Sequence, residues 1–437
     1  MIKPGSRFFP NLFLRSELLR SASVLISGTI LAQLVSILLQ PVLRRLFTPE
    51  DFGLYTVYLS LVGIIMIFSS LRYDDAIVLP KSDKESTNVM GLAIILNISI
   101  NLVIFAIVLL LRENIITFLN LPSDFPISIL AIIPLGAMLF STYGSLNAWL
   151  IRKKQYVSIS VNKLIRRSSE GASQMGFALF KNSNGLIYSD IIGQTANLAT
   201  VAIQVKKSGL DLKMISFNKI KYVFNKYSEF PRFNLIPALM SACSYLLPPI
   251  FINKYFSTET AGFFDLSKLV LSIPLAFIAS SLTSVLLQRV SEKFNRKESF
   301  ISDLKPVFMI VTFIAVGEVL TVVLFGEKIF SFAFGKEWTT SGAISKIMVW
   351  SFAINFIVST FSSIFFSMRR IKTYSVWQFF YFILILSLIL FKHLPFEEFL
   401  IIYVIIEVIC FLTVASILAY IIYRYESAFS LTTSNKV

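Results

Sequence analysis

The chain has 437 residues, of which 55% are hydrophobic and only 15% are charged. Soluble domains carry about 25% charged residues, so this composition excludes an ordinary soluble protein and indicates a membrane protein. The net charge of +15 would suggest nucleic acid in a soluble protein. In a membrane protein Lys and Arg orient the helices, so we expect no nucleic-acid partner.

Twelve membrane-spanning helices are predicted, because a bilayer core needs about 20 helical residues per span. The apolar windows are 21–43, 53–71, 88–111, 126–151, 157–180, 185–205, 230–253, 261–288, 306–325, 342–368, 373–391 and 399–423. The window 157–180 carries several charges and is the least apolar. Residues 1–20 do not resemble a cleaved signal peptide, since no small-residue cleavage site follows the first apolar run.

The distribution of Lys and Arg tests this count. With the N-terminus in the cytoplasm, the inner segments hold 26 of the 40 Lys and Arg residues and the outer loops hold 8. Removing 157–180 as a span would move every later loop to the other side and abolish this bias. We therefore predict a multi-pass, all-α protein with both termini in the cytoplasm. Its predicted parts are a cytoplasmic N-terminus (1–20), an N-lobe (21–205), a basic cytoplasmic linker (206–229), a C-lobe (230–423) and a cytoplasmic tail (424–437).

Catalysis is not predicted. No outer loop is long enough to form an enzyme domain, and no Walker motif is present. The single histidine, His393, lies in a short loop, which argues against a His-based catalytic or metal site. Cys243 and Cys410 both lie in apolar stretches, so no disulfide framework is predicted. We expect no catalytic residue, no metal site and no cofactor.

The two halves of the chain resemble each other. Residues 45–53 (RLFTPEDFG) match residues 254–262 (KYFSTETAG), and 113–118 (ENIITF) match 327–332 (EKIFSF) in the same order. Six spans per repeat give both halves the same orientation, related by an axis along the membrane normal. Transporters of this kind place the substrate path between the halves and alternate access by rocking them.

Residues 43–55 (LRRLFTPEDFGLY) and 71–80 (LRYDDAIVLP) resemble the segments that follow the first and second helices of the Wzx-type polysaccharide flippases. That resemblance implies the fold of the multidrug/oligosaccharidyl-lipid/polysaccharide exporter superfamily, with two six-helix lobes in a V, as in MATE transporters. It implies a bacterial inner-membrane flippase for an oligosaccharide repeat unit (O-antigen, capsule or exopolysaccharide) on undecaprenyl diphosphate. It also implies a polymerase and a chain-length regulator as partners beside membrane lipids.

The charged window 157–180 is the strongest candidate for substrate binding. Its charges recur at helical spacing on one face: Lys163, Arg166, Arg167 and Glu170. Cations at membrane depth must face protein or water, so this face could contact a diphosphate or a sugar. The alternative is an interfacial helix start whose cations reach the lipid headgroups.

A polar stripe on the window 21–43 is the second candidate. Its members lie three or four residues apart and continue into the next segment: Thr29, Gln33, Ser36, Gln40 and Arg44. Amides and hydroxyls suit sugar hydroxyls, although small polar residues also form hydrogen bonds between membrane helices.

The two family-like segments supply candidate gate residues: Arg45, Glu50, Gly53, Arg72 and Asp74. Arg45 could pair with Glu50 or Asp51 as a gate or cap. Asp74 and Asp75 could bind a metal-bound sugar nucleotide, but a salt-bridged loop with Arg72 is the expected arrangement.

Three intramembrane charges are candidates for ion coupling: Asp265, Lys268 and Glu407. Asp265 and Lys268 lie three residues apart on one face, which suits either a local ion pair or a site for H⁺ or Na⁺. Asp190, Glu318 and Lys346 are interpreted as further isolated intramembrane charges.

The leading hypothesis is therefore an oligosaccharide-lipid flippase. A multidrug or metabolite exporter of the same superfamily is the first alternative, and the three cations of 157–180 argue against it. A membrane polymerase or ligase is the second, and it would require a long outer loop. A scaffold of the glycan assembly complex is the third.

Overall fold

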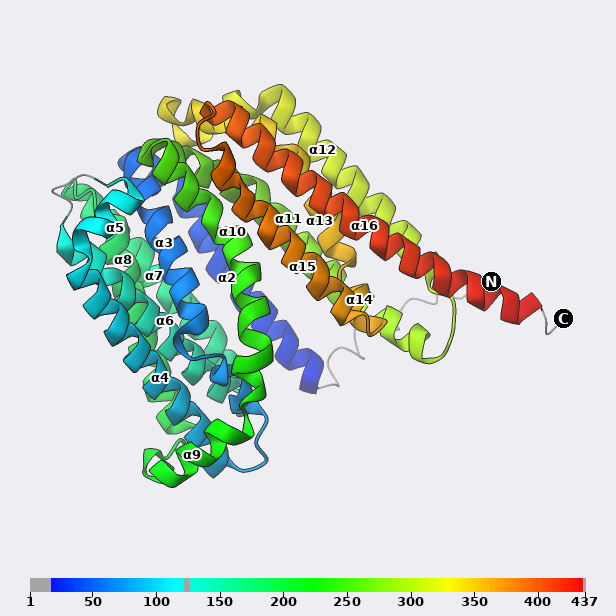
Figure 1. The fold of residues 1–437 in the computed structure, drawn as a ribbon, viewed down its shortest axis with the longest axis horizontal. Helices are drawn as coiled ribbons and strands as arrows, with labels where there is room; N and C mark the ends of the chain where they lie inside the picture. Colours follow the sequence, from blue (N-terminus) through cyan, green and yellow to red (C-terminus); the bar gives the residue numbers. More distant parts are fainter. Residues whose placement is uncertain (1–16, 122–125, 435–437) are drawn as a thin grey trace, which may run out of the picture. The chain divides into compact units, whose positions relative to one another are not determined.

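A computed structural model describes residues 17–121 and 126–434, and every regular element in that part of the chain is helical (Figure 1). Contacts divide the chain into two compact units. Unit 1 contains Val57–Ala242 and the chain before Phe52, and unit 2 contains Cys243–Val437 with the short segment Phe52–Thr56. The all-α fold class predicted from composition is confirmed.

Unit 1 is built from long helices joined by short connections. They are α2 (Glu17–Leu46), α3 (Pro49–Ser69), η1 (Tyr73–Val78), α4 (Asp83–Leu110), α5 (Arg112–Leu119), α6 (Ile127–Arg152), α7 (Tyr156–Leu179), α8 (Gly185–Lys207), η2 (Leu212–Met214) and α9 (Phe217–Lys226). In Figure 1, α4, α6, α7 and α8 lie side by side with nearly parallel axes.

The second half of the chain repeats this sequence of helices. After the π-helical turn η3 (Phe230–Asn234) come α10 (Leu235–Tyr255), α11 (Thr258–Asn295), α12 (Ile301–Phe334), η4 (Lys336–Trp338), α13 (Thr339–Phe361), α14 (Ser363–Ser367), α15 (Ile371–Leu386), η5 (Ser387–Phe391) and α16 (Phe396–Ser434). The third and fourth long helices pack together in each unit, as α4 with α6 and α12 with α13. The fourth long helix also packs against the sixth in each unit, as α6 with α8 and α13 with α16. The fifth packs against the sixth, as α7 with α8 and α15 with α16.

The internal repeat seen in the sequence has a local structural counterpart at the start of each second helix. The Thr48 hydroxyl accepts a hydrogen bond from the Asp51 N–H, and the Asp51 carboxylate accepts one from the Thr48 N–H, which forms a capping box. At the matching position in the repeat, the Ser257 hydroxyl accepts from the Thr260 N–H. The repeat therefore conserves a helix start in both halves.

Each of the twelve predicted windows forms a helix, but the count of twelve spans is not confirmed. By length and composition, nine helices of the described residues are apolar enough to cross a membrane, and the bent α11 brings the number to ten. The two left over are α7 and α8, the helices that carry paired charges (below). Several charges lower the mean hydropathy of a helix even where neighbouring helices surround it. That α7 and α8 cross the membrane stays a prediction.

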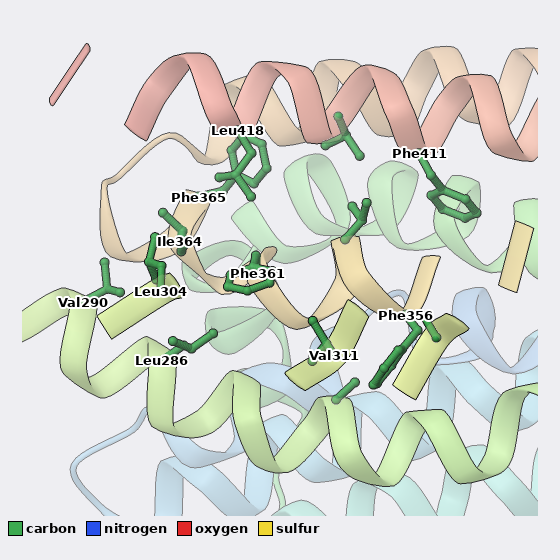
Figure 2. Packing of buried hydrophobic residues seen from close by; sticks show 14 of the residues in the cluster. Leu286, Val290, Leu304, Val311, Phe356, Phe361, Ile364, Phe365, Phe411 and Leu418 are labelled. Carbon is green, nitrogen blue, oxygen red and sulfur yellow. The ribbon is translucent and has the colours of Figure 1, made fainter. Parts of the chain in front are cut away.

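Unit 2 has a large apolar core between α11, α12, α13, α14 and α16 (Figure 2). Leu286 and Val290 of α11 and Leu304 and Val311 of α12 lie on one side, and Leu418 of α16 lies on the other. Phe356 and Phe361 of α13 fill the space between them. Close packing of such side chains stabilises helix association in a bilayer through dispersion contacts.

The basic linker is folded onto unit 1. The Asn88 side chain of α4 donates to the Met214 carbonyl and accepts from the Ser216 N–H, both at 3.0 Å. Glu85, one turn earlier, binds Lys226 at 2.5 Å and accepts from the Tyr227 hydroxyl at 2.9 Å. The hydrogen bond that Lys226 donates to the Glu85 carboxylate raises the pKa of Lys226. These contacts fix α9 to the first turns of α4.

Candidate functional site

Helix α7 packs closely against its neighbours α2 and α8 in unit 1, and small residues make this possible. A Cβ atom at Gly193 of α8 would lie 2.9 Å from the Cβ atom of Glu170 and 3.1 Å from the Arg166 carbonyl. On the other side, Gly171 lies against the side chain of Leu39 of α2. The charged face of α7 is thus surrounded by protein on two sides.

Arg166 and Asp190 form the centre of a buried polar cluster. The Arg166 guanidinium lies 3.3 Å from the Asp190 carboxylate of α8, and Asp190 is 1% exposed. Asp190 also accepts a hydrogen bond from the Tyr58 hydroxyl of α3 at 3.0 Å, and the Arg166 guanidinium lies over the ring of Phe140 at 4.8 Å. Gln194, one turn along α8, donates to the same carboxylate at 3.5 Å. The cluster links α3, α6, α7 and α8.

Arg167 and Lys163 lie on the same face but are more accessible. Arg167 binds Glu170 at 2.9 Å, and its side chain remains 38% exposed while that of Glu170 is 6% exposed. Lys163 is half-buried and donates to the Thr29 hydroxyl of α2 at 2.8 Å. The structure therefore brings part of the α2 stripe and the α7 face together.

The remaining residues of the α2 stripe fall into two environments. Gln33 is exposed, and Ser36 donates weakly to the carbonyl one turn before it, at 3.4 Å. Arg44 is 1% exposed and donates from Nε to the Gln40 side chain at 3.2 Å. Gln33 is accessible to a ligand, whereas Arg44 and Gln40 bind each other inside the unit.

Two interpretations of isolated charges are wrong. Asp190 is not isolated, because Arg166 and Tyr58 bind it. Lys346 of α13 is not isolated either, because it lies 2.5 Å from Glu327 of α12. The residues that bind Asp190 and Lys346 lie on other helices. The spacing of residues along a single helix cannot predict such contacts.

The segment after α3 forms the expected salt-bridged loop. Arg72 binds Asp75 at 2.6 Å, and the Ser70 hydroxyl donates to Asp74 at 2.5 Å. Leu71 and Arg72 both have positive φ, at 48° and 63°, a conformation that costs non-glycine residues about 1–2 kcal/mol each. Burial raises the pKa of Asp75, while the Arg72 guanidinium opposes the rise. The Arg72–Asp75 ion pair and the Ser70–Asp74 hydrogen bond stabilise this turn, whose positive φ angles are otherwise unfavourable.

The other gate candidates lie around the start of α3. Arg45 and Glu50 are exposed and Gly53 is buried, while Asp51 belongs to the capping box. The capping box shows that this part of the family-like segment builds a helix start. A gating role for Arg45 and Glu50 stays a prediction.

Unit 2 contains a cavity of about 310 Å³ that brings together two of the three ion-coupling candidates. Lys268 of α11 and Glu407 of α16 both line it, although they are only 8% and 6% exposed. The Lys268 ammonium donates to the Tyr245 carbonyl at 2.7 Å and lies 3.2 Å from the centre of the Tyr245 ring. The Glu407 carboxylate accepts from the hydroxyls of Tyr403 at 2.7 Å and Tyr381 at 3.2 Å.

Asp265, the third candidate, lies one turn before Lys268 and is half-buried outside the cavity lining. In the described part of the chain, no three His, Cys, Asp or Glu side chains gather as metal ligands.

The buried clusters of the two units use equivalent helices. In unit 1 the carboxylate comes from the sixth long helix (Asp190), the cation from the fifth and the phenol from the second. In unit 2 the carboxylate again comes from the sixth long helix (Glu407), a phenol comes from the fifth and the cation from the second. Sequence analysis missed the unit 1 cluster because Tyr58 carries no charge and Asp190 lies far from Arg166 in the chain.

Comparison with known proteins identifies the family. Residues 42–343 match the family described as polysaccharide biosynthesis protein. The chain belongs to this family. The capsular polysaccharide biosynthesis protein CapF of Staphylococcus aureus is 26% identical over 346 residues, which cover 76% of this chain and 81% of CapF.

Solved structures show that this member of the family has a transporter fold. The lipid II flippase MurJ in an inward closed conformation matches with a TM-score of 0.71 and 13% identity, over 95% of this chain and 93% of MurJ. An inward-facing multidrug resistance MATE transporter of the MOP superfamily matches with a TM-score of 0.70 and 13% identity, over 89% of this chain and 94% of that chain. The predicted superfamily fold is confirmed, and the protein is a multi-pass membrane protein of the polysaccharide biosynthesis family.

Proposed function

We propose that this protein is a flippase for oligosaccharide repeat units linked to undecaprenyl diphosphate. It moves them from the cytoplasmic to the periplasmic leaflet of the bacterial inner membrane by alternating access. The observation that carries the proposal is that a member of a polysaccharide biosynthesis family has the fold of MATE transporters and of the lipid II flippase MurJ. Polysaccharide assembly by way of a lipid carrier requires a membrane transporter at this step.

The α7 face in unit 1 fits the polar part of such a substrate. A diphosphate and a glycan cross the membrane only along a polar, cationic path, since each unpaired charge in hydrocarbon costs several kcal/mol. Arg167 and Lys163 retain exposed surface, and Gln33 of α2 offers an amide. We assign substrate contact to these three residues. The pairs Arg166–Asp190 and Arg44–Gln40 have a structural role, since they hold α7 and α2 in place. Glu170 orients the Arg167 side chain through their ion pair.

The unit 2 cavity fits a coupling step. A carboxylate that is held by two phenol hydroxyls beside a buried ammonium changes its interactions when a proton or an ion binds. We propose that Glu407 and Lys268, with Asp265 nearby, link H⁺ or Na⁺ movement to transport. We also propose that the protein acts without a catalytic centre, in contact with the polymerase and the chain-length regulator of its pathway.

A transport assay in proteoliposomes tests the proposal. A fluorescent oligosaccharide on undecaprenyl diphosphate is placed in both leaflets, and a membrane-impermeant glycosidase cleaves whatever reaches the outside. We expect the purified protein to make the inner pool accessible, and Arg167→Gln to slow this. If the inner pool stays protected while the same vesicles transport a cationic dye, the protein is a multidrug exporter and the flippase proposal is wrong.

A further inference from the structure

Unit 2 carries an apolar groove on its surface, separate from the Lys268–Glu407 cavity. The groove has a volume of about 680 Å³, within the range of about 300–1,000 Å³ that is usual for ligand pockets. Its lining comes from α12, α13 and α16 and is almost entirely apolar. We call it the α12–α16 groove, and its residues are Ile301, Leu304, Lys305, Phe308, Met309, Ile357, Val358, Phe361, Ala415, Leu418, Ala419, Ile422, Tyr423 and Glu426.

The groove exists because α12 and α16 both pack on α13 while leaving a space between them. Leu304, Phe361 and Leu418 are buried and form its floor, which is part of the core in Figure 2. Ala415 and Ala419 lie one turn apart on α16, and their short side chains leave the wall hollow. The exposed side chains of Phe308, Met309 and Tyr423 form the rims.

The polar residues of the groove lie together at the end where α12 begins. Glu426 is already bound, since its carboxylate accepts from the Ser299 hydroxyl at 2.6 Å and from the N–H groups of Phe300 and Ile301 at 3.0 and 3.2 Å. Lys305 is exposed and makes no ion pair or hydrogen bond with the described residues. One end of the groove therefore offers an available positive charge, and the rest offers hydrocarbon contacts.

We infer that the α12–α16 groove holds the first isoprene units of the substrate's polyprenyl chain, with the diphosphate beside Lys305. This inference rests on the proposed function and adds a site for the lipid part of the substrate. The distribution of Lys and Arg predicts that Lys305 lies at the cytoplasmic side, where the proposed substrate is made. A diphosphate carries more negative charge than a phospholipid phosphodiester, so Lys305 favours the polyprenyl carrier over bulk lipid. The methyl branches of the chain fit the space left by Ala415 and Ala419.

Photo-cross-linking of the full-length protein tests this inference. The probe is a long-chain polyprenyl diphosphate with a diazirine on its second isoprene unit, and the cross-linked peptides are mapped by mass spectrometry. We expect labelling of α12 and α16 at the groove, lost when unlabelled polyprenyl diphosphate is added and retained when the same amount of phosphatidylglycerol is added. Equal competition by phosphatidylglycerol would overturn the inference, because the groove would then be an ordinary lipid site.

Two matched substitutions on α16 separate groove filling from general damage. Ala419→Phe fills the groove, while Ser416→Phe adds the same ring at an exposed position outside it. We expect loss of labelling with Ala419→Phe only, and Lys305→Gln to abolish the preference over phosphatidylglycerol. Unchanged labelling in Ala419→Phe, or an unchanged preference over phosphatidylglycerol in Lys305→Gln, would contradict the inference.

Transport measured on the same preparations shows which proposal fails. If the wild-type protein transports the glycolipid but no label maps to the groove, the inference fails and the flippase stands. If the groove is labelled as expected but no glycolipid is transported, the proposed function fails, and the groove is a polyprenyl site of a protein with another role.

Discussion

The carboxylate of Asp190 on α8 lies 3.3 Å from the guanidinium of Arg166 on α7, and the Tyr58 hydroxyl of α3 donates to the same carboxylate. This ion pair decides how the charged face of α7 should be understood. A cation that is bound to a buried carboxylate holds helices together, whereas a neighbouring cation that keeps exposed surface can bind a ligand. The two roles make different predictions.

Breaking the Arg166–Asp190 pair should destabilise unit 1. Asp190→Ala leaves the Arg166 guanidinium buried without its partner, and breaking a buried pair from one side costs about 3–5 kcal/mol. The double variant Arg166→Met/Asp190→Leu removes both charges and should recover most of the loss. Thermal unfolding in detergent measures both. A double variant as unstable as Asp190→Ala would show that the pair is not the cause.

The same double variant separates structure from transport. If Arg166 only supports α7, the stable double variant should also transport at nearly the normal rate. If it is stable but inactive, Arg166 contacts the substrate directly, and the assignment of support to this residue is wrong.

Arg167 should contribute to transport without contributing much to stability. A hydrogen bond to a charged group is worth about 1.5–3 kcal/mol, so Arg167→Gln should slow glycolipid transport by roughly ten- to a hundredfold. Its melting temperature should fall less than that of Asp190→Ala, because the Arg167 side chain is 38% exposed and a Gln amide at this position can still donate to the Glu170 carboxylate. Lys181→Gln, an exposed cation just after α7, is the control and should transport normally.

Glu407 should be needed for coupling. Glu407→Gln keeps the side chain's size but removes the charge that Tyr381, Tyr403 and Lys268 surround, so transport should no longer respond to an imposed H⁺ or Na⁺ gradient. Exchange of labelled substrate without a gradient should continue. Glu398→Gln, an exposed carboxylate on the first turn of the same helix, should leave the response unchanged. A normal gradient response in Glu407→Gln would exclude this residue from coupling.

The matched helix caps should contribute equally. Thr48→Ala and Ser257→Ala each remove a side-chain cap, and each should lower the free energy of unfolding by about 1 kcal/mol, with additive effects in the double variant. Ser216→Ala is the control, because Ser216 precedes α9 without any side-chain cap hydrogen bond and its loss should have little effect. Unequal costs at Thr48 and Ser257 would mean that the two repeats use this turn differently.

The sequence predicted the helices and the repeat well because both leave local traces. Apolar windows of membrane length formed helices, and the matching segments 45–53 and 254–262 contain the capped starts of α3 and α11. The partners of Asp190 and Lys346 could not be predicted, because ion pairs between helices depend on which faces pack together. The α12–α16 groove could not be predicted from the sequence either, since it results from how three helices pack and from the two alanines on α16.

The leaflet at which lipid-linked repeat units accumulate in cells lacking this protein tests the flippase proposal most directly. The glycan pathway is otherwise left intact, and the glycolipids are probed from the outside with a membrane-impermeant glycosidase. We predict accumulation on the cytoplasmic leaflet, relieved by the wild-type protein and not by Arg167→Gln. Accumulation on the periplasmic leaflet would contradict the account, because it would place the protein after translocation, at polymerisation or ligation.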